Sequence, residues 1–145
     1  MATTTINLND LDGSNGFRLN VETGYSLRSV SNAGDVNGDG FDDLSFSIRG
    51  DYSRNYSTSS YVVFGKVSGF DAVMDLSEID GSNGFRVDGE TGYFLSLVSN
   101  AGDVNGDGFD DVITTTTEGS SYVVFGKASG FDAVMDLSEL DGSNG

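Results

Sequence analysis

The 145-residue chain contains no cysteine, no histidine and no proline. The absence of cysteine excludes disulfide bonds, thiolate nucleophiles and cysteine-ligated zinc sites. Histidine is the commonest general base and the commonest ligand of transition metals, and without it no nucleophile–base pair can be proposed. The sequence therefore favours a non-catalytic protein, and we do not expect an enzyme.

Basic residues and long apolar runs are also scarce. Seven Lys and Arg stand against 23 Asp and Glu, which gives a formal net charge of −16. Such a charge repels nucleic acids and anionic lipids, so neither is an expected partner. The longest apolar runs, such as 61–64, have the length of a strand, and no membrane insertion is expected. Met1–Thr5 lacks the charged and apolar segments of a signal peptide, so none is expected in this sequence.

What the chain does contain is an internal repeat. The segment Leu11–Arg18 returns almost unchanged as Ile79–Arg86, 68 positions later, and its beginning returns again at Leu140–Gly145, after 61 positions. The two periods differ by an insertion that lies between Leu44 and Ser60. A repeat of this kind indicates that each copy is one supersecondary unit stacked on the next.

Each repeat unit carries several short strand patterns. Residues 44–48 alternate between apolar and polar side chains, which is typical of a half-buried strand, and their counterparts 112–117 are rich in β-branched residues. The sequence therefore predicts an all-β fold with two four-stranded antiparallel β-propeller blades per chain. The strands are expected near 25–34, 41–48, 60–65 and 83–88 in the first unit, and near 93–102, 109–117 and 121–126 in the second.

Two identical nine-residue segments, 35–43 and 103–111, gather the acidic residues that indicate a binding site. Oxygen ligands at the first, third and fifth positions, with glycine at the sixth, suit Ca²⁺, whereas Mg²⁺ rarely uses such all-protein cages. Two Ca²⁺ per chain are therefore expected. The candidate ligands are the side chains of Asp35, Asn37, Asp39 and Asp43 with the carbonyl of Phe41, and those of Asp103, Asn105, Asp107 and Asp111 with the carbonyl of Phe109.

Two other interpretations explain these loops less well. A metal-free acidic hairpin turn needs only one or two carboxylates, whereas each loop places four within nine residues, where they repel one another. An EF-hand opens with the same pattern but requires an acidic residue at position 12 and a helix on each side. Position 12 is Phe46 in one copy and Thr114 in the other, and strand patterns follow, so the EF-hand is rejected.

These residues resemble the FG-GAP repeat, the blade unit of the integrin α-subunit propeller and of many bacterial surface and secreted proteins. The specific element is Ala-Gly-Asp-Val-Asn-Gly-Asp-Gly-Phe-Asp-Asp, preceded by Thr23–Tyr25 or Thr91–Tyr93 and followed by Tyr-Val-Val-Phe-Gly. The resemblance implies that each loop joins the first two strands of a blade and binds calcium through the ligands named above. It also implies an extracellular or cell-surface location. The family's Gly-Ala-Pro segment is replaced by Ser47–Arg49 and Thr115–Thr117.

The family strand order also gives the domain organisation. Residues 1–145 form a single propeller segment, with blade repeat 1 at 20–88 and blade repeat 2 at 89–145, where the outer strand is missing. Residues 1–19 contain an outer strand that would complete the blade of a neighbouring copy. Head-to-tail association of about three or four copies would then close a propeller of roughly six to eight blades. An excised pair of blades with ragged ends is the alternative.

The insertion in the first repeat raises a second function. Residues 49–60 contain Arg49, Tyr52, Arg54 and Tyr56, residue types that are enriched at recognition surfaces. A glycan- or protein-binding surface of the adhesin or lectin kind, on the face opposite the calcium loops, is therefore an alternative function, and a merely solvated loop is another interpretation. The near-identity of the two repeats fits a recent duplication and an engineered sequence alike.

Overall fold

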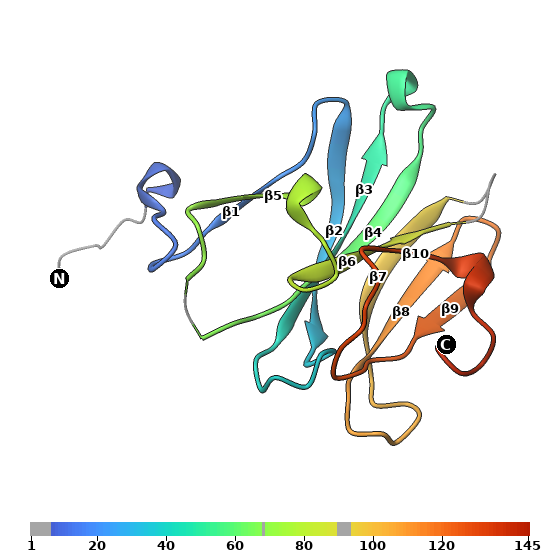
Figure 1. Cartoon of the computed structure of the whole chain (residues 1–145). Coiled ribbons are helices and arrows are strands. Elements are labelled where there is room, and N and C mark those ends of the chain that lie inside the picture. Colours follow the sequence, from blue (N-terminus) through green and yellow to red (C-terminus); the bar gives the residue numbers. More distant parts are fainter. Residues whose placement is uncertain (1–6, 68, 90–93) are drawn as a thin grey trace, which may run out of the picture.

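The computed structural model describes residues 7–67, 69–89 and 94–145 (Figure 1). Within these ranges the regular structure consists of β-strands and four short 3-10 helices. The strands are β1 (Arg18–Asn20), β2 (Tyr25–Gly34), β3 (Asp43–Gly50), β4 (Thr58–Val63), β5 (Val73–Asp75), β6 (Gly84–Asp88), β7 (Leu95–Gly102), β8 (Asp111–Thr116), β9 (Ser121–Val124) and β10 (Val134–Asp136). The 3-10 helices are η1 (Leu8–Asp10), η2 (Tyr52–Arg54), η3 (Leu76–Glu78) and η4 (Leu137–Glu139). The segment Met1–Thr5 and the strand start expected at Tyr93 lie outside the described residues.

The first repeat unit forms a four-stranded antiparallel sheet that is extended by one parallel strand. Its order is β10-β6-β4-β3-β2, with β10 parallel to β6 and the other neighbours antiparallel. The alternation in β3 places Phe46 and Ile48 on one face, where they pack with Tyr61. Ser45 and Ser47 occupy the opposite face and are wholly buried, so both faces of the sheet are covered at β3.

The second repeat unit forms the three-stranded antiparallel sheet β7-β8-β9. It packs on the first sheet, because Leu95 and Val98 of β7 lie in the same core cluster as Phe85 of β6. Small hydroxyl side chains face each other where the sheets come close, and Ser31 Oγ lies 3.1 Å from Ser99 Oγ. The two units therefore share one apolar core.

A separate two-stranded parallel sheet, β1-β5, lies to one side of the two larger sheets (Figure 1). Its register pairs Arg18 with Val73, and the same register pairs Arg86 of β6 with Val134 of β10. All four described 3-10 helices begin in one way, since the side chains of Asn7, Asp51, Asp75 and Asp136 accept the backbone N–H two residues later. The described chain thus builds the same capped turn four times.

The strand predictions are confirmed for the main sheets and incomplete elsewhere. β5 and β10 were not predicted, because a three-residue Val-Met-Asp strand is too short to show any periodicity. β3 and β8 begin at Asp43 and Asp111 rather than near 41 and 109, because these two side chains turn inward to bind backbone amides. None of the helices in the described ranges is long and apolar enough to cross a membrane.

Candidate functional site

The two acidic loops occupy equivalent places in the two sheets. Residues 35–42 connect β2 to β3, and residues 103–110 connect β7 to β8. Gly38 and Gly106 have φ angles of 71° and 77°, in the left-handed region that glycine adopts without strain. The ring of Phe109 packs where a side chain at position 38 would lie, so any residue larger than glycine would clash with this ring. The two loops are therefore similar in backbone and close to each other.

The first aspartate of each loop binds backbone amides across the turn. Asp35 Oδ1 accepts the N–H of Asp39 at 2.9 Å, and its Oδ2 accepts the N–H of Gly40 at 2.9 Å. Asp103 does the same with the amides of Asp107 at 3.0 Å and Gly108 at 2.9 Å. This carboxylate therefore lies at the centre of the curled loop.

The third and fifth loop residues point to the same centre. Asn37 Oδ1 accepts the N–H of Asp39 at 3.0 Å, so it approaches the same amide as Asp35 Oδ1. Asn37 Nδ2 donates to Asp39 Oδ2 at 3.0 Å, and Asp39 Oδ1 accepts the N–H of Phe41 at 2.9 Å. Asn105 and Asp107 repeat these contacts. The structure thus brings together the side chains predicted at the first, third and fifth positions.

The last aspartate of each loop is turned into the interior. Asp43 is wholly buried and accepts the N–H of Val36 and of Gly65, each at 2.8 Å. Asp111, also wholly buried, accepts the N–H of Val104 at 2.8 Å and of Gly126 at 2.9 Å. Burial raises the pKa of Asp43 to about 6, although the two amides oppose that shift. These carboxylates tie each loop to the end of the neighbouring strand.

Every loop carboxylate described so far is engaged with backbone amides. The described ranges contain no group of three or more Asp, Glu, His or Cys side chains placed to hold a metal ion. The donor set is nevertheless made only of hard oxygen atoms, and a carboxylate oxygen that accepts one N–H keeps a second lone pair. The residues present therefore fit a hard cation by the chemistry of their donor atoms.

A contact between the two loops was not predicted from the sequence. Asp110 Oδ2 accepts the N–H of Asp35 at 2.9 Å, and the N–H of Asp110 donates to the carbonyl of Asp35 at 3.1 Å. The equivalent Asp42 instead lies on the surface and accepts a long 3.4 Å bond from Asn32. No sequence signal identifies this contact, because the partners are 75 residues apart and Asp42 has the same local sequence.

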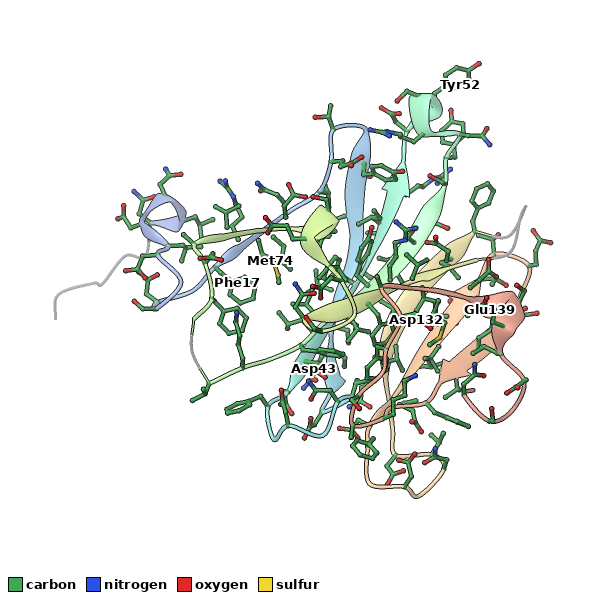
Figure 2. The ribbon with its side chains drawn as sticks, viewed as in Figure 1. Phe17, Asp43, Tyr52, Met74, Asp132 and Glu139 are labelled. Atoms are coloured by element: carbon green, nitrogen blue, oxygen red, sulfur yellow. The ribbon has the colours of Figure 1, made fainter. Side chains whose placement is uncertain are left out.

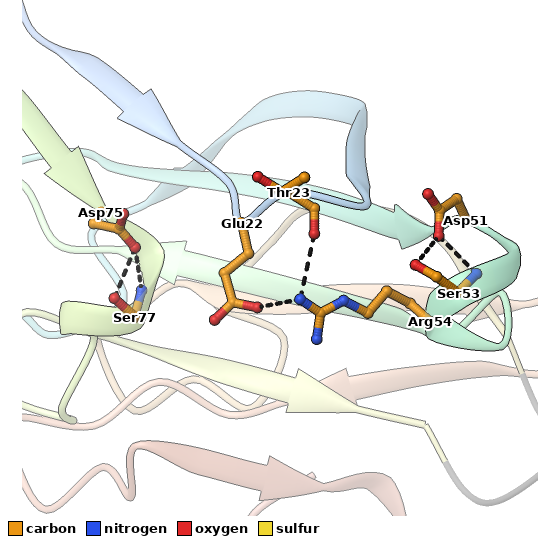
Figure 3. A network of polar contacts seen from close by, with 7 residues as sticks. All are labelled: Glu22, Thr23, Asp51, Ser53, Arg54, Asp75 and Ser77. Carbon is orange, nitrogen blue, oxygen red and sulfur yellow. Dashed lines mark hydrogen bonds and ion pairs between the residues drawn. The ribbon is translucent and has the colours of Figure 1, made fainter.

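The predicted recognition residues lie at the far end of the first sheet from Asp43, as the labelled Tyr52 shows in Figure 2. Arg54 is held by the chain itself, with its Nη2 at 3.1 Å from Glu22 and 3.3 Å from the Thr23 carbonyl (Figure 3). Tyr52 is 83% exposed. Arg49 lies over the ring of Tyr56 at 5.3 Å. Arg49 and Tyr56 line a recess of about 570 Å³, together with Arg28 and Tyr25.

Comparison with known proteins locates the family signal in the second repeat. The family model named FG-GAP repeat matches residues 94–129, which include the loop 103–111 and the strands β7, β8 and β9. No curated protein and no solved structure matches the chain. The match confirms the resemblance based on the loop and its flanking residues. The chain therefore carries an FG-GAP repeat, at residues 94–129.

Proposed function

We propose that the protein is a calcium-binding structural repeat in which each acidic loop holds one Ca²⁺, giving two ions per chain. The observation that carries this proposal is that Asp35 and Asn37 both accept the N–H of Asp39, whose own carboxylate is bonded to Asn37. Asp103, Asn105 and Asp107 repeat this arrangement. In the first loop the ion would be held by the three side chains named first, by Asp43 and by the carbonyl of Phe41. In the second loop it would be held by the equivalent side chains, by Asp111 and by the carbonyl of Phe109. Oxygen atoms alone are the ligands that Ca²⁺ prefers.

A bound cation would supply the positive charge that the described loops lack. The chain has a net charge of −16, and each loop places four aspartates within nine residues. Among the described residues, the donors to Asp43 are two backbone amides, and the pKa of Asp43 remains raised. A divalent ion at this point would favour the ionised carboxylates and hold the β2–β3 and β7–β8 connections in place.

The proposed role is structural, in a propeller that copies of the chain close together. Leu27 and Val30 on β2 are 47% and 62% exposed, although their counterparts Leu95 and Val98 on β7 are each 3% exposed in the shared core. Leu95 and Val98 of the second unit are thus covered by the first unit, whereas the equivalent Leu27 and Val30 of the first unit are exposed. Head-to-tail association of about three or four copies would cover them in a closed ring. The FG-GAP repeat supports an extracellular or cell-surface location.

Calcium titration tests the proposal directly. Chelator-treated protein should bind two Ca²⁺ per chain in isothermal titration calorimetry, with Mg²⁺ at equal concentration as the competing ion. Binding should also raise the melting temperature, because a ligand that binds the folded state alone stabilises it. Absence of binding heat together with an unchanged melting temperature would rule out the calcium sites, and light scattering independently reports whether copies associate.

A second candidate function is the binding of a glycan or protein at residues 49–60. The observation in its favour is the recess that Arg49 and Tyr56 line, where a cation and an aromatic ring lie side by side. Arg49→Ala and Tyr56→Ala should each abolish binding in a glycan and protein screen without changing the melting temperature. Arg54→Ala is not a clean test, because Arg54 also stabilises the loop through Glu22 and Tyr25.

A further inference from the structure

The short strand β1 repeats the sequence and the environment of β6. Gly16–Arg18 corresponds to Gly84–Arg86, and each strand is paired with the parallel strand that follows it, β5 or β10, in the same register. Phe17 stacks on Phe70 with ring centroids 4.5 Å apart, as Phe85 stacks on Phe131 at 4.8 Å. The β1-β5 sheet is therefore preformed in the arrangement of the β6–β10 pair.

The two strands differ in their second neighbour. β6 is also paired with β4, whereas β1 has β5 as its only partner among the described strands. The N–H of Arg18 donates to Ala72 beside β5, at 2.9 Å. Because the backbone groups of successive residues point to opposite edges of a strand, the amides of Phe17 and Leu19 face the free edge. β1 is thus an open edge with donors and acceptors in place.

The strand β9 also has one edge that pairs with no other described strand. β9 is the counterpart of β4, yet across the described part of the chain it is paired with β8 alone. Its residues are correspondingly less buried, since Tyr122 is only partly buried and Tyr61 is buried. Phe125 is likewise only partly buried, whereas its counterpart Phe64 is buried against the Phe85–Phe131 stack, with centroids 6.1 Å and 5.3 Å away. The same side chains are covered in one repeat and open in the other.

We propose that β1 of one copy pairs antiparallel with β9 of a second copy and becomes the fourth strand of its second sheet. The inference rests on the proposed self-association and specifies which edges meet. The pairing of β4 with β6 within the chain fixes the register, because it matches Tyr61 with Arg86 and Ser59 with Asp88. The corresponding pairs between copies are Val124 with Gly16, Val123 with Phe17, Tyr122 with Arg18, Ser121 with Leu19 and Ser120 with Asn20.

The two edges of one chain cannot meet each other, because β1 and β9 lie on opposite sides of the molecule (Figure 1). At the junction, Phe125 of the receiving copy would land beside the stacked rings of Phe17 and Phe70. The loop that precedes β1, Leu11–Gly16, would take the place of Leu140–Gly145, whose Asn144 carbonyl accepts the N–H of Phe125 at 2.9 Å. An equivalent loop replaces it, so these contacts are kept while strand pairing and ring packing are gained.

Disulfide trapping tests the register. The chain has no cysteine, so the only disulfides are those that introduced cysteines form. Ser59 Oγ donates to Asp88 Oδ1 at 2.8 Å, which shows that the side chains of the matching pair within the chain meet. Asn20→Cys with Ser120→Cys should therefore form disulfides between copies, visible as a ladder of dimers and larger species in non-reducing electrophoresis. Ser59→Cys with Asp88→Cys is the positive control and should give an intrachain bond.

The negative control is Asn20→Cys with Tyr122→Cys, which shifts the register by two residues and should form no ladder. A second pair of variants distinguishes backbone pairing from side-chain contact. Leu19→Pro removes the N–H at the free edge and should leave the chain monomeric, whereas Leu19→Ala keeps that N–H and should still associate. Circular dichroism and melting of both variants verify that they remain folded.

Each outcome of these experiments is decisive. Association with in-register cross-links supports the proposal. Association without them, or with equal cross-linking in the shifted control, overturns the proposed edges and leaves self-association standing. A monomer at tens of micromolar in light scattering overturns both, while the calcium proposal is judged separately by titration.

Discussion

The carboxylate of Asp110 accepts the backbone N–H of Asp35 at 2.9 Å, and the amide of Asp110 donates in return to the Asp35 carbonyl at 3.1 Å. One loop is thereby bonded in both directions to the first residue of the other loop. Lys127 adds to this link, because its N–H donates to the carbonyl of Val36 at 3.0 Å. The two acidic loops form one connected structure rather than two independent turns.

Replacing Asp110 should therefore affect the first loop, although Asp110 belongs to the second. Asp110→Ala removes a charged acceptor from the amide of Asp35, and hydrogen bonds to charged groups contribute about 1.5–3 kcal/mol. We expect the free energy of unfolding to fall by about 1–2 kcal/mol in urea denaturation. Asp42→Ala is the matched control at the equivalent surface position, where a change within about 0.5 kcal/mol is expected. Equal effects of the two substitutions would contradict the coupling.

Asp39→Ala combined with Asp107→Ala should reproduce the effect of a chelator. These side chains would bind the proposed ions without being buried, so their removal should eliminate calcium binding more than it damages the fold. At a calcium concentration 100 times the dissociation constant, each lost site removes about 2.7 kcal/mol of stabilisation. Melting curves of the double variant should be the same with and without chelator. Asp71→Ala, at an exposed position outside both loops, should keep the full calcium response.

The rings of Phe85 and Phe17 should differ in their contribution to the stability of a single copy. Phe85 is wholly buried, and truncation of a buried Phe costs about 3–5 kcal/mol. Phe17 is only partly buried, so Phe17→Ala should cost clearly less than Phe85→Ala when both are measured by urea denaturation at low protein concentration. If copies associate through β1, the cost of Phe17→Ala should grow with protein concentration, whereas that of Phe85→Ala should not.

The aspartates that begin η3 and η4 should make stability depend on acid pH. Hydrogen bonds from the amide and hydroxyl of Ser77 lower the pKa of Asp75 below its usual 3.8, and the hydroxyl and amide of Ser138 lower the pKa of Asp136. A lowered pKa contributes stability that is present above the unfolded value and is lost as pH falls through the folded pKa, thus below 3.8.

Melting temperatures in chelator should accordingly drop as the pH falls below about 4, through this contribution among others. Asp75→Asn with Asp136→Asn provides the control, since Asn accepts the same hydrogen bonds without titrating, as Asn7 does in η1. The drop should be smaller in this variant than in the original chain. An equal drop in both would show that these two carboxylates do not contribute.

The internal repeat made the main sheets predictable from the sequence. Two copies of one pattern, with strand signals at matching positions, indicate β2, β3, β4 and β6 and their counterparts. The loop pattern also predicts which side chains converge, because ligands at the first, third and fifth positions lie on the inside of a curled turn.

What the sequence did not reveal are differences between equivalent residues. Leu27 and Leu95 have the same role in the pattern, yet one is exposed and the other buried, because only β7 has a sheet packed against it. Asp42 and Asp110 differ for a similar reason, since only Asp110 has a loop beside it. A repeat pattern describes one unit, whereas these differences arise from the neighbours of each unit.

The hairpins β3–β4 and β8–β9 are closed by connections of different length at the same end of the strands. In the first, the N–H of Gly50 donates to the carbonyl of Ser57 at 2.7 Å, and in the second the N–H of Thr116 donates to Ser120 at 2.9 Å. The strands of the two hairpins pair in the same register although their connections differ in length. We therefore expect this end of each hairpin to accept an inserted foreign peptide with the strand register unchanged.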